Sequence, residues 1–396
     1  MLHAVIMAGG TGTRFWPESR ARRPKQLLRM VGQKTMIRAT VDRLGDLVPP
    51  GRVLVATTVE LAGKIAEELP ELSREAILAE PCKRNTAPCI GLAALHLSRD
   101  DPDATMAVMP ADHVIGPDES FREAIRLAAA LVDRRPERIV TFGIRPSYPA
   151  ESFGYIERGE PLAPLPPGEG WGEGKPSPLP LGEGRSEDGP SPLPLGEGQG
   201  EGEVPPVHHV KQFREKPDAR TAAKYMESGR YYWNSGIFVW KARTILAALA
   251  EHQPEMYGRL KRIAAAAGTP QYDEVFWAEF AAIKGISIDY AVMEHAAEVL
   301  VIEAPFDWDD LGSWQSLARL RGTDEQGNTI AAKHLGLKTT GTIVRGSDEH
   351  LIVTLGLSDC IIVQTPDATL VANKQDEESI RQIVELLEAR GWLQYL

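Results

Sequence analysis

Near its N-terminus the chain reads Ala4-Val5-Ile6-Met7-Ala8-Gly9-Gly10-Thr11-Gly12-Thr13-Arg14-Phe15-Trp16-Pro17, and Arg22-Arg23-Pro24-Lys25-Gln26 follows shortly after. The apolar run at the start predicts a buried strand. The glycines that follow predict a loop whose successive backbone N–H groups can point at one anion, because glycine tolerates positive φ and adds no side-chain bulk. Arg14 and Lys25 would add positive charge, so a polyphosphate is the natural ligand for this loop.

A glycine-rich turn can also join a strand to a helix without binding anything, so the loop needs support from other residues. It is not a Walker loop, because no Gly-Lys-Ser/Thr ends it. It is a poor dinucleotide fingerprint as well, because the segment 10–15 lacks the third glycine. The loop alone therefore predicts a phosphate site without identifying the ligand.

Composition narrows the class of protein. The chain has 396 residues, which suggests two or three domains, and its 43% hydrophobic content is that of a soluble globular protein. Its net charge is −11, from 44 basic and 55 acidic residues, which argues against a general nucleic-acid binder. Any anion site must therefore be a local concentration of positive charge.

Cysteine usage and the N-terminus bear on the compartment. The three cysteines, Cys82, Cys89 and Cys360, form no Cys-x-x-Cys pair, which favours a reduced cytoplasm. Met1 to Ala4 leads straight into the first strand without a signal peptide. No apolar run approaches the ~20 residues that span a bilayer. We expect a cytoplasmic protein that binds neither membranes nor nucleic acid.

The first 145 residues alternate between apolar strands and amphipathic helices. This alternation predicts a parallel sheet covered on both faces, with ligands at the carboxyl ends of the strands. Those ends carry Gly9-Gly10, Glu80, Asp112 and Gly143. The expected strands are 2–8, 52–57, 75–80, 105–110 and 138–143, and the expected helices are 34–45, 60–69, 86–98 and 119–134.

Residues 160–206 break this pattern. The segment 176–184 recurs identically as 190–198, and both copies are rich in proline and glycine. Such a composition cannot build a core, so we predict a disordered low-complexity insertion over 161–205. It separates two segments, 153–156 and 209–213, that read as adjacent strands once it is removed. Because a hairpin tip tolerates insertions, we expect its deletion to leave activity nearly unchanged.

The second half of the chain predicts helices at 218–228, 242–266 and 273–281, a helix opening at 289–294, an aromatic strand at 231–240 and an apolar strand at 299–304. The last seventy residues differ, because short strands recur every eight to ten residues before a terminal helix at 376–390. The expected strands there are 342–344, 350–354, 360–365 and 368–372. We therefore divide the chain into a first domain, 1–320, and a C-terminal β domain, 325–396.

Several polar residues in this frame could carry chemistry. Asp112 and Asp310 each follow an apolar strand, and two carboxylates that face one cleft suit Mg²⁺, which prefers few carboxylates together with phosphate oxygens and water. Either could instead be a helix cap or a turn residue. Asp309 is a near equivalent of Asp310. Glu215 and Lys216 are adjacent and would face opposite sides of a strand.

Seven motifs, in this order along the chain, closely resemble the sugar-phosphate nucleotidylyltransferases, and within them the mannose-1-phosphate guanylyltransferase branch. The resemblance runs from residue 2 to about 380 and omits the insertion. It implies a Rossmann-like, mixed-sheet α/β nucleotidyltransferase domain of the GT-A-like kind, followed by a small all-β domain like a left-handed β-helix. The motifs span 9–17, 24–26, 80–88, 110–113, 213–217, 233–236 and 310–314.

The resemblance implies that GTP and mannose 1-phosphate react to give GDP-mannose and pyrophosphate, with Mg²⁺ as the cofactor. It also assigns roles to residues. The GTP phosphates would be wrapped by Ala8, Gly9, Gly10, Gly12 and Thr13, with Arg14 on the leaving pyrophosphate and Lys25 on the α-phosphate. Mg²⁺ would be bound by Asp112 and Asp310. Mannose would be held by Gly154, Glu215 and Asn234, with Lys216 on its phosphate, and the residues near guanine and ribose would be Glu80, Asn85 and Thr86.

Two departures from the family pattern leave details open. The segment 151–156 differs from the usual motif of the sugar pocket, and Trp308-Asp309-Asp310 differs from the usual Trp-Ser-Asp, which leaves Asp309 as an alternative metal ligand. The chain lacks the cupin-like isomerase domain of bifunctional members, so we expect transferase activity alone. A different base or hexose, or a non-catalytic sugar-nucleotide sensor, are the competing functions. A homodimer is the assembly to be tested.

Overall fold

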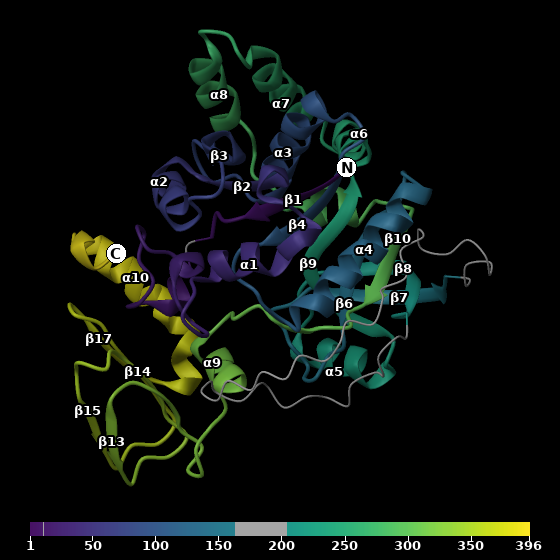
Figure 1. The fold of residues 1–396 in the computed structure, drawn as a ribbon. Helices are drawn as coiled ribbons and strands as arrows, with labels where there is room; N and C mark the ends of the chain where they lie inside the picture. Colours follow the sequence, from purple (N-terminus) through teal and green to yellow (C-terminus); the bar gives the residue numbers. More distant parts are fainter. Residues whose placement is uncertain (11, 163–203) are drawn as a thin grey trace, which may run out of the picture.

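We describe a computed structural model of residues 1–10, 12–162 and 204–396 (Figure 1). The core of the predicted insertion, residues 163–203, lies outside the described residues, and so does Thr11 of the glycine-rich loop. Along the described chain, no helix combines the length and the apolar character needed to cross a bilayer.

A nine-stranded sheet forms the centre of the molecule, in the order β3-β2-β1-β4-β9-β6-β10-β8-β7. The first four strands are parallel, as predicted, but β9 runs antiparallel between β4 and β6. The sheet is therefore mixed, which confirms the fold that the family resemblance implies. The strands are β1 (Leu2–Met7), β2 (Val53–Thr58), β3 (Ile77–Glu80), β4 (Thr105–Pro110), β6 (Ile139–Ile144), β7 (Tyr155–Pro161), β8 (Val207–Arg214), β9 (Tyr231–Lys241) and β10 (Val299–Glu303).

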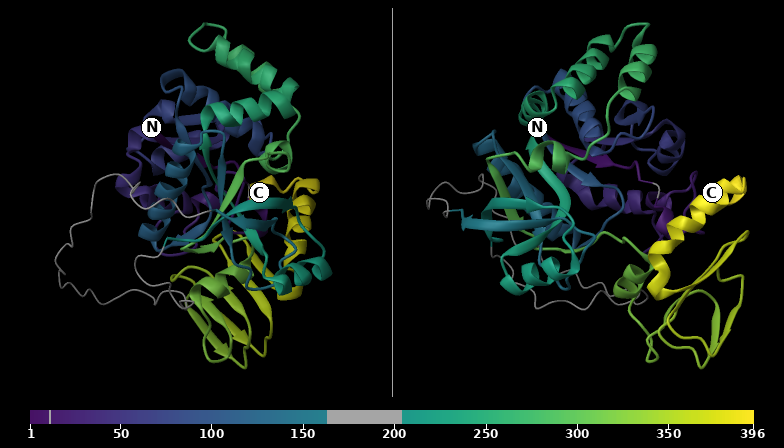
Figure 2. Two further views of the ribbon diagram at one scale, coloured as in Figure 1. Left: turned by 90° about the vertical axis from the view of Figure 1, so that its right-hand side faces the viewer. Right: turned by 180° about the vertical axis from the view of Figure 1, so that it is seen from behind.

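Helices cover both faces of this sheet (Figure 2). Because successive side chains of a strand point to opposite faces, Ala4 and Ile6 of β1 join one apolar cluster and Val5 joins the other. The first cluster is closed by α1 (Met36–Leu44), α2 (Val59–Glu68) and α4 (Asp118–Arg134). The second is closed by α3 (Thr86–Asp100), α6 (Ala242–His252), α7 (Pro254–Ala266) and α8 (Tyr272–Ala281).

Two helix predictions were wrong in detail. The single helix expected over 242–266 is two helices, α6 and α7, because Pro254 occupies the first position of α7 and cannot donate a backbone hydrogen bond. The helix expected to open at 289–294 is a single π-helical turn, η6 (Asp289–Met293).

The hairpin predicted on either side of the insertion is present. Strand β7 pairs antiparallel with β8, with Tyr155 opposite Arg214 and Ile156 opposite Phe213. At the open end, the backbone N–H of Leu162 donates to the carbonyl of Val207 at 2.8 Å. The chain thus leaves and re-enters the fold at neighbouring points. Helix α5 (Ala219–Ser228) follows β8.

The C-terminal region is a coil of short parallel strands. Strands β12 (Thr329–Ala331), β14 (Ile343–Arg345) and β16 (Cys360–Gln364) are parallel neighbours, and β13 (His334–Leu337) pairs parallel with β15 (Ile352–Leu355). Strand β17 (Thr369–Asn373) adds antiparallel to β16, and α10 (Ile380–Ala389) ends the region. This arrangement is β-helix-like, as the family resemblance implies, and it includes β12 and β13, which we did not predict.

The C-terminal region packs against the glycine-rich loop. Phe15 and Trp16 of the loop share one apolar cluster with Trp314, which opens α9 (Trp314–Arg321), and with Ile361 and Leu387. Figure 1 shows α10, in yellow, beside the purple N-terminal segment. The loop that follows the first strand and the segment that ends the chain therefore meet at the same place.

Candidate active site

Lys25 lies at the centre of the candidate site. It begins the short 3-10 turn η2 (Lys25–Leu27) and is 6% exposed. Its ammonium donates to the carbonyl oxygen of Asp310 at 2.5 Å and forms an ion pair with Asp112 Oδ2 at 2.8 Å. Three segments distant in sequence thus meet at one nitrogen, and three of the predicted site residues are brought together.

The glycine-rich loop closes directly over Lys25. Gly12 has φ 62°, and a Cβ there would lie 2.5 Å from Cβ of Lys25, so only glycine fits. At Gly9 and Gly10, by contrast, a Cβ would meet no heavy atom within 4 Å. Packing within the described chain therefore does not require glycine at these two positions, whereas close approach of a ligand to their backbone would.

A small antiparallel pair of strands brings the two carboxylates together. Strand β5 (Val114–Gly116) follows Asp112, and β11 (Asp307–Asp309) leads into Asp310. Burial raises the pKa of Asp310 to about 6, and the negative charges of Asp309 and Asp112 act in the same direction against Lys25. Burial also acts to raise the pKa of Asp112, but the charges of Lys25 and His113 and the hydrogen bonds to the carboxylate together outweigh it, and the pKa is lowered.

These residues fit a divalent cation. Burial raises the pKa of Asp310 even though Lys25 is nearby, so a bound cation would favour the ionised form of this carboxylate. Across the residues that the structure describes, His, Cys, Asp and Glu side chains form no cluster of three that could hold a metal. A site of two carboxylates completed by phosphate oxygens and water suits Mg²⁺.

The carboxylate of the neighbouring Asp309 already has other partners. Its Oδ1 accepts from the backbone N–H of Leu311 at 2.7 Å, and its Oδ2 forms an ion pair with Arg319 at 3.0 Å. Among the described residues, the carboxylate of Asp310 accepts only a 3.1 Å hydrogen bond from the N–H of Gly312. The geometry therefore favours Asp310 over Asp309 as a metal ligand.

Arg14 lies beside the same loop. Its Nη1 donates to the carbonyl of Gly312 at 3.3 Å, and its Nη2 forms an ion pair with Glu378 at 3.1 Å. Glu378 belongs to η7 (Lys374–Ser379) in the C-terminal region. The sequence offered no signal that Glu378 approaches the glycine-rich loop, because several hundred positions separate it from Arg14.

The three residues expected to hold the sugar also lie together. The backbone N–H of Asn234 donates to the carbonyl of Gly154 at 2.8 Å. A Cβ at Gly154 would lie 2.8 Å from Oε2 of Glu215, so glycine makes room for this carboxylate. Lys216 pairs with Glu215 at 3.2 Å.

The expectation that Glu215 and Lys216 face opposite sides of a strand was wrong. Strand β8 ends at Arg214, and both residues lie in the turn that follows it. Lys216 has φ 39°, which turns the backbone and lets its ammonium reach the neighbouring carboxylate. The alternation rule does not apply outside the strand.

Asp289 lies beside the residues expected to hold the sugar, although sequence reasoning did not assign it to the site. Its Oδ1 accepts a hydrogen bond from Nδ2 of Asn234 at 3.0 Å. Burial, and then the charge of Glu215, raise its pKa to about 6. The available signal was a lone carboxylate within the apolar run from Ile288 to Met293.

The three residues expected near the base make different structural contacts. Asn85 has φ 68° and caps α3 by accepting from the N–H of Thr86 at 2.8 Å. The hydroxyl of Thr86 accepts from the N–H of Ile288 at 2.9 Å, which links this loop to Asp289. Glu80 is buried beside Cys89, with its Oε1 unpartnered, and burial raises its pKa to about 7.

Backbone strain concentrates at the candidate site. Among the described residues, five that are not glycine have positive φ, and three of them are Asn85, Lys216 and Leu311. Each stands in one of the motifs that carried the resemblance. Strained conformations of this kind cluster at functional sites, where the surrounding structure holds them in place.

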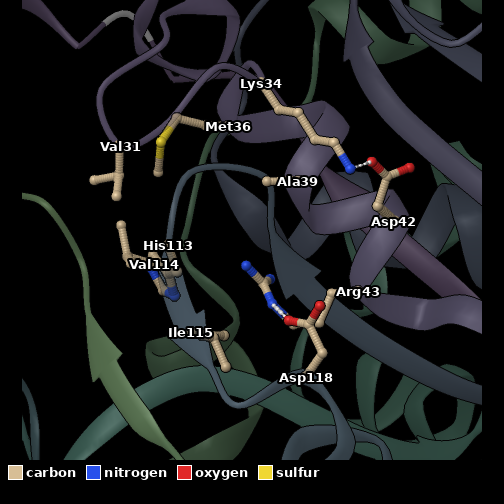
Figure 3. A pocket seen from close by; sticks show the side chains of 10 residues that line it. All are labelled: Val31, Lys34, Met36, Ala39, Asp42, Arg43, His113, Val114, Ile115 and Asp118. Carbon is tan, nitrogen blue, oxygen red and sulfur yellow. Dashed lines mark ion pairs between the residues drawn. The ribbon is translucent and has the colours of Figure 1, made fainter. Parts of the chain in front are cut away.

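A pocket of about 220 Å³ adjoins this site on the side of His113 (Figure 3). Arg43 pairs with Asp118 at 3.5 Å and Lys34 with Asp42 at 2.7 Å within it. These pairs leave the pocket close to neutral, whereas a triphosphate needs a surplus of positive charge. We therefore place the nucleotide at the glycine-rich loop. The lining residues are Val31, Lys34, Met36, Ala39, Asp42, Arg43, His113, Val114, Ile115 and Asp118.

Known proteins are similar to this chain over nearly its whole length. A family model described as nucleotidyl transferase matches residues 3–163 and 199–327, and one described as a MannoseP isomerase/GMP-like beta-helix domain matches 332–387. Mannose-1-phosphate guanylyltransferase 2 of Escherichia coli O157:H7 is 34% identical, over 99% of this chain and 75% of the relative. Mannose-1-phosphate guanylyltransferase ManC of Salmonella typhimurium is 35% identical, over 98% and 74%.

Two solved structures share the fold of this chain. A crystal structure from Thermus thermophilus, described as a mannose-1-phosphate geranyltransferase, is 29% identical with a TM-score of 0.78 and covers 98% of this chain and 99% of its own. A mannose-6-phosphate isomerase from Helicobacter pylori, 23% identical with a TM-score of 0.55 over 78% of this chain and 99% of its own, shares the fold. The chain belongs to the mannose-1-phosphate guanylyltransferase family of nucleotidyl transferases.

Proposed function

We propose that this protein transfers GMP from GTP to α-D-mannose 1-phosphate and releases GDP-mannose and pyrophosphate. The observation that carries the proposal is the buried ammonium of Lys25, held between Asp112 and Asp310 under the glycine-rich loop. Similarity over the full chain to mannose-1-phosphate guanylyltransferases supports this choice of substrates.

The reaction needs no general base. The second pKa of a phosphomonoester is about 6, so mannose 1-phosphate is largely a dianion near neutral pH. One of its phosphate oxygens forms a bond to the α-phosphorus of GTP. The bond between that phosphorus and the oxygen bridging to the β-phosphate breaks, and pyrophosphate leaves with the electron pair. The main obstacle is the approach of two polyanions.

Cationic side chains of the chain address this obstacle. Lys25 would stabilise the charge that builds on the α-phosphate, and Arg14 would hold the leaving pyrophosphate. The backbone from Ala8 to Thr13 would surround the phosphates, consistent with the open space beside Gly9 and Gly10. Asp112 and Asp310 would hold Mg²⁺, which when bound neutralises phosphate charge. No described side chain needs to accept a proton in this scheme.

On the sugar side, Glu215 and Asn234 would accept and donate hydrogen bonds to mannose hydroxyls, with room provided at Gly154. Asp289 would hold the amide of Asn234 in a fixed orientation, because its carboxylate accepts from Nδ2. Lys216, which pairs with Glu215 in this structure, would instead pair with the phosphate of mannose 1-phosphate when the substrate binds. Asn85 and Thr86 would lie toward the nucleoside, and Glu80 would support that loop from the core.

One assay separates this function from its competitors. Purified protein is incubated with Mg²⁺, mannose 1-phosphate and each of the four NTPs, and pyrophosphate release is measured. We expect release with GTP, and a chelator should abolish it. Activity with another NTP or with glucose 1-phosphate alone would move the protein to another branch of the family. Binding of GTP without release under any pairing would favour a sensor. The homodimer is a separate proposal, which sedimentation equilibrium tests.

A further inference from the structure

The C-terminal region reaches the candidate site through one charged side chain. Arg14 is the residue assigned to the leaving pyrophosphate, and it has two partners in the described chain, the carbonyl of Gly312 and the carboxylate of Glu378. Its Nε is buried without a hydrogen-bond partner. The direction in which the guanidinium points therefore depends on these two contacts.

Glu378 is itself held in place by its neighbours. The preceding residue, Glu377, is buried and accepts from the backbone N–H of Trp314 and, at 3.0 Å, from Nε2 of Gln315. At the other end of η7, the N–H of Lys374 donates to the carbonyl of Asp359 at 2.8 Å. The turn is thus fixed to the start of α9 and to the β coil, and Glu378 extends from a rigid support.

Both contacts of Arg14 lead back to the metal side of the site. Gly312, whose carbonyl accepts from Arg14, donates its N–H to the Asp310 carboxylate at 3.1 Å. Trp314, two residues later, anchors Glu377. The segment 310–314 therefore fixes both a candidate metal ligand and the support of Glu378, which sets Arg14 in a defined position relative to Asp310.

We propose that Glu378 is a positioning residue for Arg14, and that the C-terminal region thereby contributes to binding of the pyrophosphate group. This inference rests on the proposed function. Glu378 is 69% exposed, and among the described residues its side chain forms no ion pair with the sugar side. Its effect on catalysis should therefore pass entirely through Arg14 and should concern pyrophosphate alone.

The test uses the reverse reaction, in which GDP-mannose and pyrophosphate give GTP and mannose 1-phosphate. We expect Glu378→Ala to raise the KM for pyrophosphate about three- to fivefold, the size of an ion pair at a partly exposed position. The KM for GDP-mannose should stay within about twofold of wild type. Glu378→Gln keeps an acceptor for Arg14 and should recover most of the loss, whereas Glu378→Lys should exceed it.

Matched controls separate positioning from other effects. Asp376→Ala removes an exposed carboxylate of the same turn and should leave both KM values unchanged. In an Arg14→Ala background, Glu378→Ala should cause no further change, because its effect acts through Arg14. Unchanged kinetics in both Glu378→Ala and Glu378→Lys would overturn the proposal. A lower KM for pyrophosphate in Glu378→Ala would also overturn it, since it would mean that Glu378 only repels the ligand.

Failure of the positioning role can be told apart from failure of the proposed function. Wild-type protein that releases no pyrophosphate from GTP and mannose 1-phosphate would refute the function. In that case calorimetric binding of pyrophosphate with Mg²⁺ still compares wild type with Glu378→Ala. Equal affinities there would refute the positioning role by itself.

Discussion

The ammonium of Lys25 is buried between a carboxylate and a carbonyl, in a position where a charge costs free energy unless it is compensated. We expect Lys25→Ala to lower kcat about 10²–10³-fold, the range seen when one donor to a developing charge is removed. Pyrophosphate release measures this loss. Lys261→Ala, a surface lysine on α7, should retain wild-type rates. A Lys25→Ala protein that is folded by circular dichroism and fully active would contradict the assigned role.

Glu80 carries a prediction about stability. Its pKa is raised by burial to about 7 from an ordinary 4.5, so between these pH values the folded state binds more protons than the unfolded state. The stability contributed by this group is present below pH 4.5 and is lost as pH rises to 7. Glu80→Gln should therefore gain free energy of unfolding relative to wild type, by up to about 3 kcal/mol, between pH 4.5 and pH 8.

Urea denaturation of both proteins at pH 5 and pH 8 measures this difference. If the free energies of unfolding of the two proteins differ by the same amount at both pH values, the carboxyl of Glu80 does not titrate as described. Far-UV circular dichroism of Glu80→Gln at each pH ensures that the comparison starts from the same fold.

At the residue scale, sequence reasoning identified candidate residues but not the contacts between them. Lys25, Asp112 and Asp310 were identifiable from motifs, because each residue type suits phosphate or metal. Their meeting at one nitrogen was not, since it depends on the β5–β11 pair, and strands of three residues have little sequence signal. The choice of Asp310 over Asp309 likewise needed the position of Arg319.

Among the elements, the π-helical turn η6 (Asp289–Met293) is the one whose function we would test first. It places Asp289 on the amide of Asn234. Asp289→Ala should raise the KM for mannose 1-phosphate about tenfold, because a hydrogen bond to a charged group is worth about 1.5–3 kcal/mol. The KM for GTP should change little. Initial-rate kinetics with each substrate varied separately decide the point, and equal changes in both KM values would indicate general disruption instead.

The β7–β8 hairpin carries a second prediction at this scale. Because Leu162 and Val207 are hydrogen-bonded neighbours, a tight turn can replace residues 163–203 without moving either strand. We expect such a variant to keep kcat within about twofold and to keep both KM values. Deletion variants with turns of two and four residues provide the comparison. Loss of activity in both, with the fold retained, would assign a function to the deleted segment.

Most elements could be predicted from apolar periodicity, and the exceptions have physical causes. The antiparallel direction of β9 is set by its partners β4 and β6, which periodicity does not reveal. The strands β12 and β13 contain three and four residues and become strands only when neighbouring turns of the coil supply partners. Tertiary pairing, rather than local propensity, decides such segments.

Across the whole molecule, the two parts of the chain share a core and a set of charged contacts. Arg345 of β14 pairs with Glu18 through two hydrogen bonds of 3.0 and 2.8 Å, and Nε1 of Trp16 donates to the carbonyl of Tyr395 at 2.8 Å. Ile361 of β16 is fully buried in the cluster that contains Phe15. The contacts are extensive enough that we expect the parts to unfold together.

Ile361→Ala tests this coupling. The cavity it leaves should lower the free energy of unfolding by about 2–5 kcal/mol. If the parts are coupled, the protein should keep a single transition, and loss of activity should follow the same midpoint as loss of tryptophan fluorescence and circular dichroism. Two separate transitions, with activity retained through the first, would show that the β coil unfolds independently of the site. Val371→Ala, at an exposed position of β17, is the control.

The position of β9 between β4 and β6 also bears on synthesis of the chain. Both flanking strands leave the ribosome while the strand that joins them is still untranslated. In the meantime β4, which pairs with β1, has one open edge, and β6 has two, because its other neighbour β10 is also untranslated. At about 5–20 residues per second, residues 163–203 lengthen that interval by about 2–8 s. Open strand edges are templates for pairing with other chains. The insertion thus adds an aggregation risk during translation, and the hairpin variant that lacks it should give a higher yield of folded protein on expression.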